Sequence, residues 1–301
     1  MTNEQKVLKF TGRIVAGAYY NFQEIRKGTM NRVRDIIRKK AEGIDFDEVE
    51  EKIKEKKYDA KYADATLMKT LRETKKLFSS KEYAYLMKTL ETANKTQALE
   101  KQYEKLMLTY IREEKVYEEF LKHIRGIGAV LSANLIKEFG YCEKYEHVSS
   151  LWKHCGLHVV NGVAPKKKKG EIIEYNPRLR TMMWKIGDQF IKQKSPFYRD
   201  IYDQTKKKQL ARKYKMGELK EKFNGYKKED IHLSKGHAHA RAMRKSEKIF
   251  LEHYWVCSRE LVGIETGKPY VVEHLGHEDY VSYKEALAIN KGEDYVKSRQ
   301  N

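Results

Sequence analysis

The sequence contains few residues that break helices and few that could cross-link a chain. Only four prolines occur in 301 residues, and Lys, Glu, Leu and Ala are frequent, which favours helix over strand. The three cysteines, Cys142, Cys155 and Cys257, form no CxxC pair and are too few for a disulfide framework. We interpret them as reduced, partly buried thiols.

Long apolar runs are also missing. No stretch approaches the roughly 20 apolar residues that a membrane-spanning helix needs, and no N-terminal signal pattern is visible. These absences predict a soluble, cytoplasmic protein that has no membrane partner.

Acidic residues are outnumbered by basic ones. The 62 Lys and Arg residues against 43 Asp and Glu residues give a formal net charge of +19. So much positive charge indicates a polyanionic partner, and nucleic acid is the commonest. We therefore expect a nucleoid-associated protein that binds DNA, and RNA remains an alternative partner.

The spacing of apolar residues predicts a mainly α fold. A helix is predicted over residues 13–40, with apolar side chains at every third or fourth position. Its other face carries basic side chains and is either a solvated surface or one that follows phosphates: Arg26, Lys27, Arg32, Arg34, Arg38, Lys39 and Lys40. Residues 1–12 are expected to be frayed. Further helices are predicted at 46–60, 63–77 and 81–90, with a capped turn at Ser79 and Ser80.

The helix predicted over residues 95–124 has the most regular pattern. Apolar and aromatic side chains recur there at alternating four- and three-residue steps, with Glu113 as an interruption: Leu99, Tyr103, Leu106, Tyr110, Tyr117, Phe120 and Ile124. The pattern is compatible with a coiled coil that makes a homodimer through residues 99–124. A helix packed inside a single-chain bundle is compatible with it as well.

Two glycines one residue apart begin the stretch on which the functional prediction depends. The segment Arg125-Gly126-Ile127-Gly128 joins a helix end to a new apolar helix over residues 129–139, and glycine allows a sharp turn. The first-turn amides of the new helix and its positive dipole end together form a site that can accept a phosphate. Gly140 is expected to end this helix.

A short β-hairpin is predicted next. Residues 158–163 and 171–175 are predicted to be strands on either side of a lysine-rich tip, Lys166, Lys167, Lys168, Lys169 and Gly170. Adjacent lysines at an exposed tip can bind phosphates electrostatically, so we predict a DNA contact there.

Asn176 and Pro177 are predicted to cap and begin a helix. Arg178 and Arg180 lie in its first turn, where they oppose the helix dipole unless a phosphate binds. The residues of this helix that we predict to be core are Met183, Trp184, Ile186 and Phe190.

A last long helix is predicted from Gly236 to about Gly263. It supplies three further candidates for nucleic-acid binding, Arg241, Arg244 and Lys245, and its predicted buried residues are Ile249, Phe250, Tyr254 and Trp255. His237 and His239 are two residues apart and so lie on different helix faces, and we predict neither a metal nor a cofactor. A surface loop is predicted at 216–235, a strand at 270–273 and a helix at 282–289.

In this order, the motifs resemble the C-terminal transposase domain of the DEDD-type, bridge-RNA-guided insertion-sequence recombinases. The resemblance covers about residues 121–263 and rests on Arg125–Gly128, Cys155–Leu157, Lys166–Gly170 and Asn176–Arg180. It implies a helix-hairpin-helix domain that binds DNA in transposition or recombination. Members of this family also have an N-terminal RuvC-like nuclease domain. No strand that could place its metal-binding carboxylates is visible between Met1 and Ile124, so we expect that domain to be missing.

The resemblance also implies a nucleophilic serine near residues 161–164. No serine occurs from Leu151 to Lys194, and Asn161 and Gly162 cannot act as hydroxyl nucleophiles. The nearest side chains with a hydroxyl or thiol are Cys155, Tyr175, Ser149 and Ser150. We assign no catalytic residue, and enzymatic activity is left open.

The chain is therefore predicted to have four parts: an N-terminal helical region (1–94), a seam helix (95–122), a helix-hairpin-helix DNA-binding domain (123–263) and a tail (264–301). The predicted function is DNA binding through phosphates by a relative of transposases. The alternatives are an active recombinase with another nucleophile or a partner nuclease, an RNA-binding module, and a non-catalytic scaffold.

Overall fold

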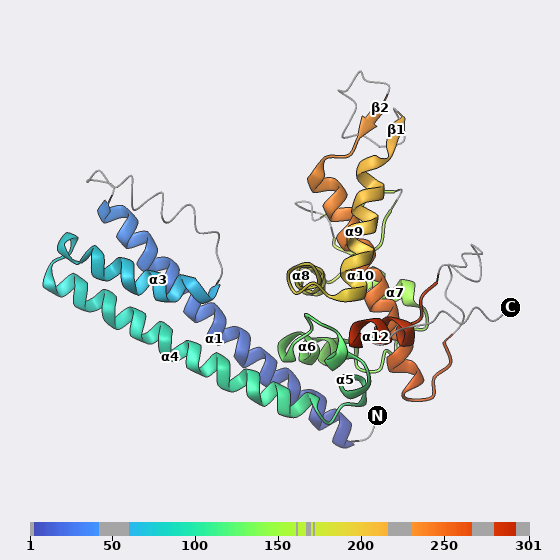
Figure 1. Cartoon of the computed structure of the whole chain (residues 1–301). Helices are drawn as coiled ribbons and strands as arrows, with labels where there is room; N and C mark the ends of the chain where they lie inside the picture. The colour runs from blue at the N-terminus through green and yellow to red at the C-terminus, as the bar shows by residue number, and fades with distance from the viewer. Residues whose placement is uncertain are drawn as a thin grey trace. The chain divides into compact units, whose positions relative to one another are not determined.

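The computed structural model describes residues 3–41, 60–160, 162–166, 170, 172–215, 230–266 and 280–292. The chain divides into two compact units, unit 1 (residues 1–108) and unit 2 (residues 109–301). Both units are mainly helical, which confirms the predicted fold class (Figure 1). No helix in the described part of the chain is long and apolar enough to cross a membrane.

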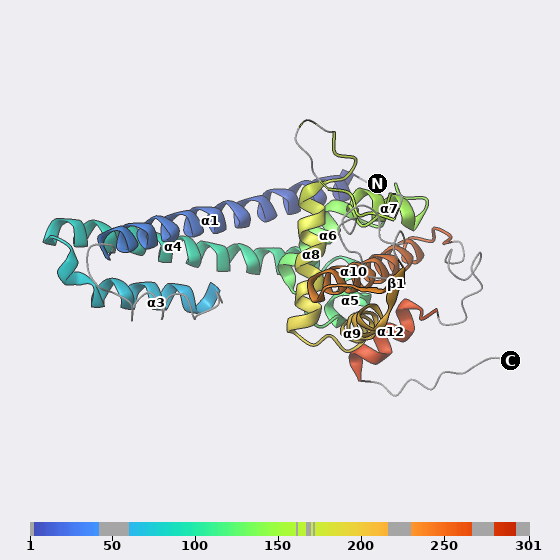
Figure 2. The same cartoon turned by 90° about the horizontal axis from the view of Figure 1, so that it is seen from above.

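Unit 1 is built on three helices, α1 (Asn3–Ala41), α3 (Ala60–Glu73) and α4 (Ser80–Ile111, which enters unit 2 after Leu108). The helices α1 and α4 run antiparallel, and α3 lies beside them (Figures 1 and 2). All three contribute to one apolar core, whose buried members are Met30, Val33, Ile37, Leu67, Leu71, Phe78, Leu86, Leu90 and Ala93. The apolar residues whose spacing predicted these helices therefore pack into one shared core.

Two predictions about unit 1 are confirmed and one is wrong. The predicted turn at Ser79 is present, and a reciprocal cap holds it: Glu82 N donates to Ser79 Oγ at 3.3 Å, and Ser79 N donates to Glu82 Oε2 at 2.9 Å. Helices are present on either side of it, although the one predicted at 81–90 continues without a break as α4, and the one predicted at 63–77 ends as α3 at Glu73. Residues 3–12, which we expected to be frayed, belong to α1, because this segment is rich in strong helix formers. The predicted helix at 46–60 lies outside the described residues, apart from Ala60.

The predicted continuous helix over residues 95–124 is wrong. Helix α4 ends at Ile111, and a short helix α5 (Lys115–Glu119) and a 3₁₀ turn η2 (Leu121–His123) follow. The three residues between α4 and α5 are charged, so they supply no apolar side chain that would carry the buried face onward. Leu106, one of the predicted seam positions, is 52 % exposed. A homodimer through residues 99–124 stays a prediction, without the support of an unbroken seam.

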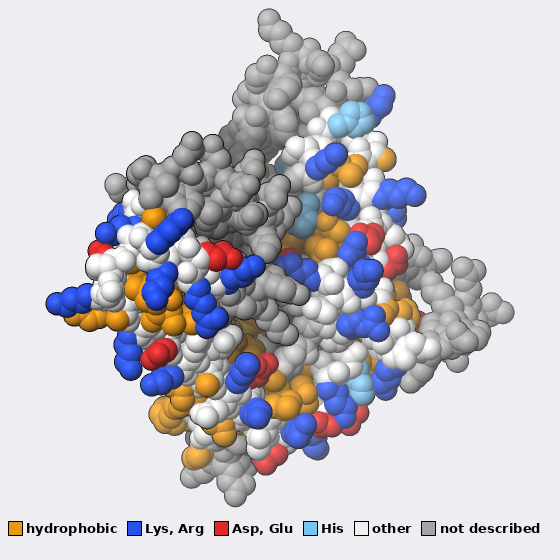
Figure 3. Space-filling view, turned by 60° about the vertical axis from the view of Figure 1, so that its left-hand side comes forward, with side chains coloured by type: hydrophobic (Ala, Val, Ile, Leu, Met, Phe, Trp, Pro, Cys, Tyr) orange, Lys and Arg blue, Asp and Glu red, His pale blue; other side chains and the backbone are white. Residues whose placement is uncertain are grey.

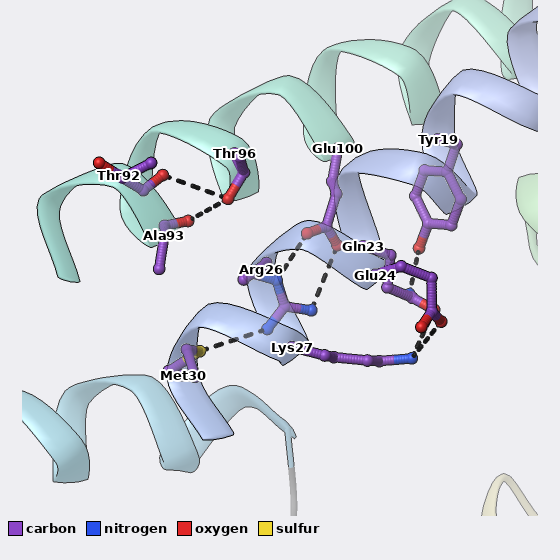
Figure 4. A network of polar contacts seen from close by, with 10 residues as sticks. All are labelled: Tyr19, Gln23, Glu24, Arg26, Lys27, Met30, Thr92, Ala93, Thr96 and Glu100. Carbon is purple, nitrogen blue, oxygen red and sulfur yellow. Dashed lines mark hydrogen bonds and ion pairs between the residues drawn. The ribbon is translucent and has the colours of Figure 1, made fainter. Parts of the chain in front are cut away.

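A buried ion pair joins α1 to α4. Arg26 Nε donates to Glu100 Oε1 at 2.6 Å and Arg26 Nη2 to Glu100 Oε2 at 3.2 Å, and both side chains are less than a tenth exposed (Figure 4). Beside it, the rings of Phe22 and Tyr103 lie 5.3 Å apart. Arg26 was predicted to belong to the basic face of this helix, and the structure removes it from that face. A bidentate ion pair of this kind fixes the register of α1 against α4.

We expect the loss of either partner of this pair to destabilise unit 1 strongly. Arg26→Leu or Glu100→Leu leaves an uncompensated buried charge, which costs roughly 3–5 kcal/mol, whereas the double variant removes both charges and recovers most of that loss. Urea unfolding followed by circular dichroism measures the effect. Asp35→Asn, which breaks the exposed pair with Lys39 at 3.0 Å, is the control and should cost under about 1 kcal/mol. Single variants that lose no more stability than this control would contradict the prediction.

Unit 2 is arranged around α10 (Lys235–Glu260). Four other helices pack against it: α7 (Val148–His154), α8 (Pro177–Lys192), α9 (Pro196–Ala211) and α12 (Tyr283–Lys291). Helix α9 runs alongside α10, whereas α8 crosses it (Figures 1 and 2). Helix α6 (Ala129–Phe139) joins the same core. The rings that stack at its centre include Phe120, Phe190, Tyr198 and Phe250.

The predicted caps in unit 2 are confirmed. Asn176 Oδ1 accepts hydrogen bonds from the amides of Arg178 and Leu179, and Pro177 begins α8. Gly140 follows α6 with a φ of +55°, a backbone conformation that favours glycine. The helix predicted at 282–289 is α12, which a capping box at Ser282 and Glu285 begins. The predicted strand at 270–273 and residues 216–229 of the predicted loop lie outside the described residues.

The β-hairpin predicted over residues 158–175 is wrong for the residues that the structure describes. Only an isolated bridge between Val160 and Val163 forms there, and Ile172 is almost fully exposed. A two-stranded antiparallel ladder instead joins β1 (Lys213–Lys215) to β2 (Asp230–His232). In the first predicted strand, His158 O accepts from the Arg244 side chain, and Val160 and Val163 bond to each other rather than to a second strand.

Candidate nucleic-acid interface

The two glycines of the 125–128 turn have different roles. Gly126 has a φ of +99°, and a Cβ added to it would lie 3.2 Å from the backbone oxygen of Gln189 in α8. Gly126 therefore provides both the left-handed turn and the close approach to α8. Gly128 has an ordinary φ of −85°, and no atom lies within 4 Å of where its Cβ would be. Only the first glycine is required by the packing.

Gly128 leaves the start of α6 open. It occupies the N-cap position without a side chain that could accept a hydrogen bond, and it is exposed, as is Arg125 beside it. The first backbone bond of the helix runs from Ser132 N to Gly128 O at 3.0 Å, so the preceding amides have no acceptor within the helix. A phosphate at this end would meet both these amides and the positive end of the helix dipole.

Ile127, a predicted nucleic-acid-binding residue, has a structural role instead. Its side chain is 6 % exposed, and its amide donates to Ile124 O at 3.0 Å. Because both groups are used inside the protein, Ile127 positions the turn and is not itself exposed to a ligand.

Arg180 and Arg244 hold the segment that follows α7. Arg180 Nη1 donates to Pro165 O at 2.5 Å, and Arg244 Nη1 donates to His158 O at 3.2 Å. Arg180 also lies 5.1 Å from the centre of the Tyr175 ring, and that ring occupies the space that a Cβ on Gly156 would fill. The glycine of the Cys155–Leu157 motif thus leaves room for the aromatic partner of Arg180.

A buried carboxyl lies beside these two arginines. Glu247 is 5 % exposed and faces α8 at Gly187, where an added Cβ would approach Glu247 Oε1 to 2.7 Å. Burial raises the pKa of Glu247 to about 7, although the charges of Arg244 and Arg180 act in the opposite direction. Burial lowers the pKa of Arg244, and the neighbouring charge of Arg180 lowers it further. The three groups form one electrostatic cluster between α8 and α10.

The remaining predicted contact residues are spread over unit 2. Arg178 and Lys245 are exposed, whereas Arg241 donates to Gln209 Oε1 at 3.0 Å, between α10 and α9. Lys166 is exposed, and Lys167, Lys168 and Lys169 lie outside the described residues. Basic side chains are distributed over the viewed face, with acidic ones among them (Figure 3). Among the described candidates, the structure brings together Arg180 and Arg244, whereas Arg241 belongs to a separate contact between α10 and α9.

The side chains considered as replacements for a nucleophilic serine differ in accessibility. Cys155 is fully buried, and burial raises the pKa of its thiol, so it is protonated at neutral pH. Tyr175 is half-buried against Gly156. Ser149 and Ser150 are exposed in the first turn of α7.

Sequence reasoning missed Glu247 and misplaced Trp184. Glu247 follows Met243 by four residues and precedes Phe250 by three, so a signal was present: a carboxylate within an apolar helix stripe. Trp184, predicted to be core, is 55 % exposed, whereas Met183, Ile186 and Phe190 of the same stripe are fully buried as predicted.

A comparison with protein families gives a match in this part of the chain. Residues 118–203 match the model of a family described as "Transposase IS116/IS110/IS902 family". The matched residues include the 125–128 turn, α6, α7, α8 and the start of α9, so the chain contains a transposase-related domain. No curated protein and no solved structure matches the chain.

We expect Gly126→Ala to destabilise the protein and Gly128→Ala to be tolerated. At Gly126 a side chain meets both the positive φ and the Gln189 backbone, a cost of roughly 1–3 kcal/mol. At Gly128 neither applies, and the loss should stay under about 1 kcal/mol. The midpoint of urea unfolding measures both variants, and equal losses would contradict the assigned roles.

Glu247 should make stability fall as pH rises. Between the usual carboxyl pKa of 4.5 and the folded value of about 7, the folded protein holds a proton that the unfolded chain has released. Stability present below this window is therefore lost across it, by up to roughly 3 kcal/mol. Glu247→Gln should remove this contribution and make the profile between pH 5 and pH 8 less steep, leaving that of Glu252, whose pKa burial also raises to about 7. The exposed Glu143→Gln is the control, and an unchanged pH profile in Glu247→Gln would refute the assignment.

Proposed function

We propose that this protein binds DNA through the phosphate backbone, as a relative of insertion-sequence transposases that acts in transposition or recombination. The observation that carries the proposal is the overlap of the family match over residues 118–203 with the exposed start of α6. In this proposal the 125–128 turn and α6 work as a helix-hairpin-helix element, and the amides that follow Gly128 contact a phosphate.

The basic side chains supply the rest of the contact. Arg125, Arg178 and Lys245 are exposed, and the formal net charge of the chain is +19. Contacts of this kind give affinity and orientation but little sequence information, so base-specific readout is not part of the proposal. Arg180 and Arg244 act mainly by holding residues 158–165 in place, because their guanidinium groups bond to the backbone carbonyls there.

A substitution series at Gly128 tests the proposal without disturbing the fold. Gly128→Ala leaves the α6 amides open, Gly128→Asn covers them with a neutral cap, and Gly128→Asp covers them with a negative charge. Asn and Asp are good N-caps, so stability should hold or rise slightly. DNA affinity should fall in the order Ala, Asn, Asp, with a loss of about ten-fold or more for Asp.

Mobility-shift titration at several salt concentrations measures this affinity. Binding to phosphates weakens steeply as salt rises, and Arg178→Glu or Lys245→Glu should reduce the slope by about 1 per lost contact. A Gly128→Asp protein that binds duplex DNA as tightly as the natural one would exclude the α6 contact. Stronger competition by structured RNA than by duplex DNA would favour an RNA-binding module instead. Salt-insensitive or absent binding would favour a scaffold.

A further inference from the structure

Trp184 differs from the other two tryptophans in its surroundings. Trp152 Nε1 donates to Lys248 O at 3.0 Å, and Lys248 Nζ lies 4.0 Å from the centre of its ring. Trp255 is 6 % exposed and donates to Tyr145 O at 2.8 Å. Trp184 is 55 % exposed on α8. Two tryptophans therefore serve the fold, and the third presents a large aromatic surface to solvent.

The exposure of Trp184 follows from how α8 packs. The apolar side of α8 is buried at Leu179, Met183, Ile186 and Phe190, while Trp184 and Thr181 lie among its exposed positions. Packing inside the protein therefore does not explain this tryptophan, and we look for its role in binding to another molecule.

The helix that carries Trp184 has more basic than acidic residues. Helix α8 carries four basic residues, Arg178, Arg180, Lys185 and Lys192, against one acidic residue, Asp188, which pairs with Lys192. Trp184 is the one large hydrophobic side chain of α8 that is mostly exposed in the structure. A protein partner would need a contiguous apolar patch, which one tryptophan does not provide. A single exposed aromatic ring on a basic helix is instead typical of surfaces that stack on nucleobases.

We propose that Trp184 stacks on an unpaired base, so that the preferred ligand is DNA with a gap, bulge or single-stranded segment rather than continuous duplex. This inference rests on the proposed function, because α8 must lie along the bound nucleic acid. In a continuous duplex the faces of the bases are covered by their neighbours, so the ring has nothing to stack on. An unpaired base offers a face to the indole while the exposed Arg178 of α8 meets a flanking phosphate.

Binding to matched oligonucleotides tests the inference. A duplex, the same duplex with a three-base gap, and the single strand are titrated against the full chain and its variants. Trp184→Ala should weaken binding to gapped and single-stranded DNA by about ten-fold and leave duplex binding unchanged. Trp184→Phe keeps an aromatic face and should retain most of the affinity. Ile172→Ser, which removes another exposed apolar side chain but no aromatic face, is the matched control and should bind as the natural chain does.

Tryptophan fluorescence gives an independent readout. Trp184 is the most exposed of the three tryptophans, so stacking on a base should quench emission when single-stranded DNA is added, and Trp184→Phe should lose this quenching. Equal losses of affinity for gapped DNA and duplex in Trp184→Ala, or no loss for either, would overturn the inference. A shift from dimer to monomer in sedimentation with DNA affinity intact would overturn it in favour of a second copy of this chain. If the natural chain binds none of the oligonucleotides, the proposed function fails as well.

Discussion

The burial of α10 is the interaction on which the rest of unit 2 depends. Phe250 and Tyr254 are fully buried, and several polar groups of this helix reach carbonyls in other segments. Tyr254 Oη donates to Gly140 O at 2.7 Å, Trp255 Nε1 to Tyr145 O at 2.8 Å, and Ser246 Oγ to Tyr198 O at 2.8 Å. These bonds tie α10 to three other segments of unit 2 and give its buried polar side chains partners. Helix α10 therefore supplies both the apolar surface and the donors that hold the surrounding helices.

This arrangement has a consequence for the transposase-related segment. The family match ends at residue 203, whereas α10 begins at Lys235. Phe120 and Phe190, within the match, stack or cross against Phe250 in α10. One turn later in α10, burial lowers the pKa of His253 to about 4, so its ring is neutral. The two ring nitrogens bond to Tyr198 Oη in α9 and to the carbonyl of Val281, just before α12. The matched segment buries its aromatic side chains only with help from the later part of the chain.

Local sequence signals predicted local structure well. The cap at Asn176, the turn at Ser79 and the glycine end of α6 all depend on residues within a few positions, and each is present. The prediction of a helix over 95–124 failed because a periodic pattern does not tell whether successive stretches face the same partner. Leu99 lies in unit 1, whereas Phe120 lies in the core of unit 2. Around the lysine-rich segment, the carbonyls of His158 and Pro165 accept from Arg244 and Arg180, two arginines distant in sequence that a local pattern does not reveal.

The helical class, the caps, the turn at Gly126 and the excess of positive charge can all be derived from the amino-acid sequence, because they depend on composition and short-range geometry. Three other features became visible only in the folded chain: Arg26 is buried against Glu100, Glu247 lies between α8 and two arginines, and Trp184 faces solvent. Burial and pairing depend on which faces of distant helices meet. A stripe of apolar residues shows that a helix has a buried side, but the neighbouring helices set its edges.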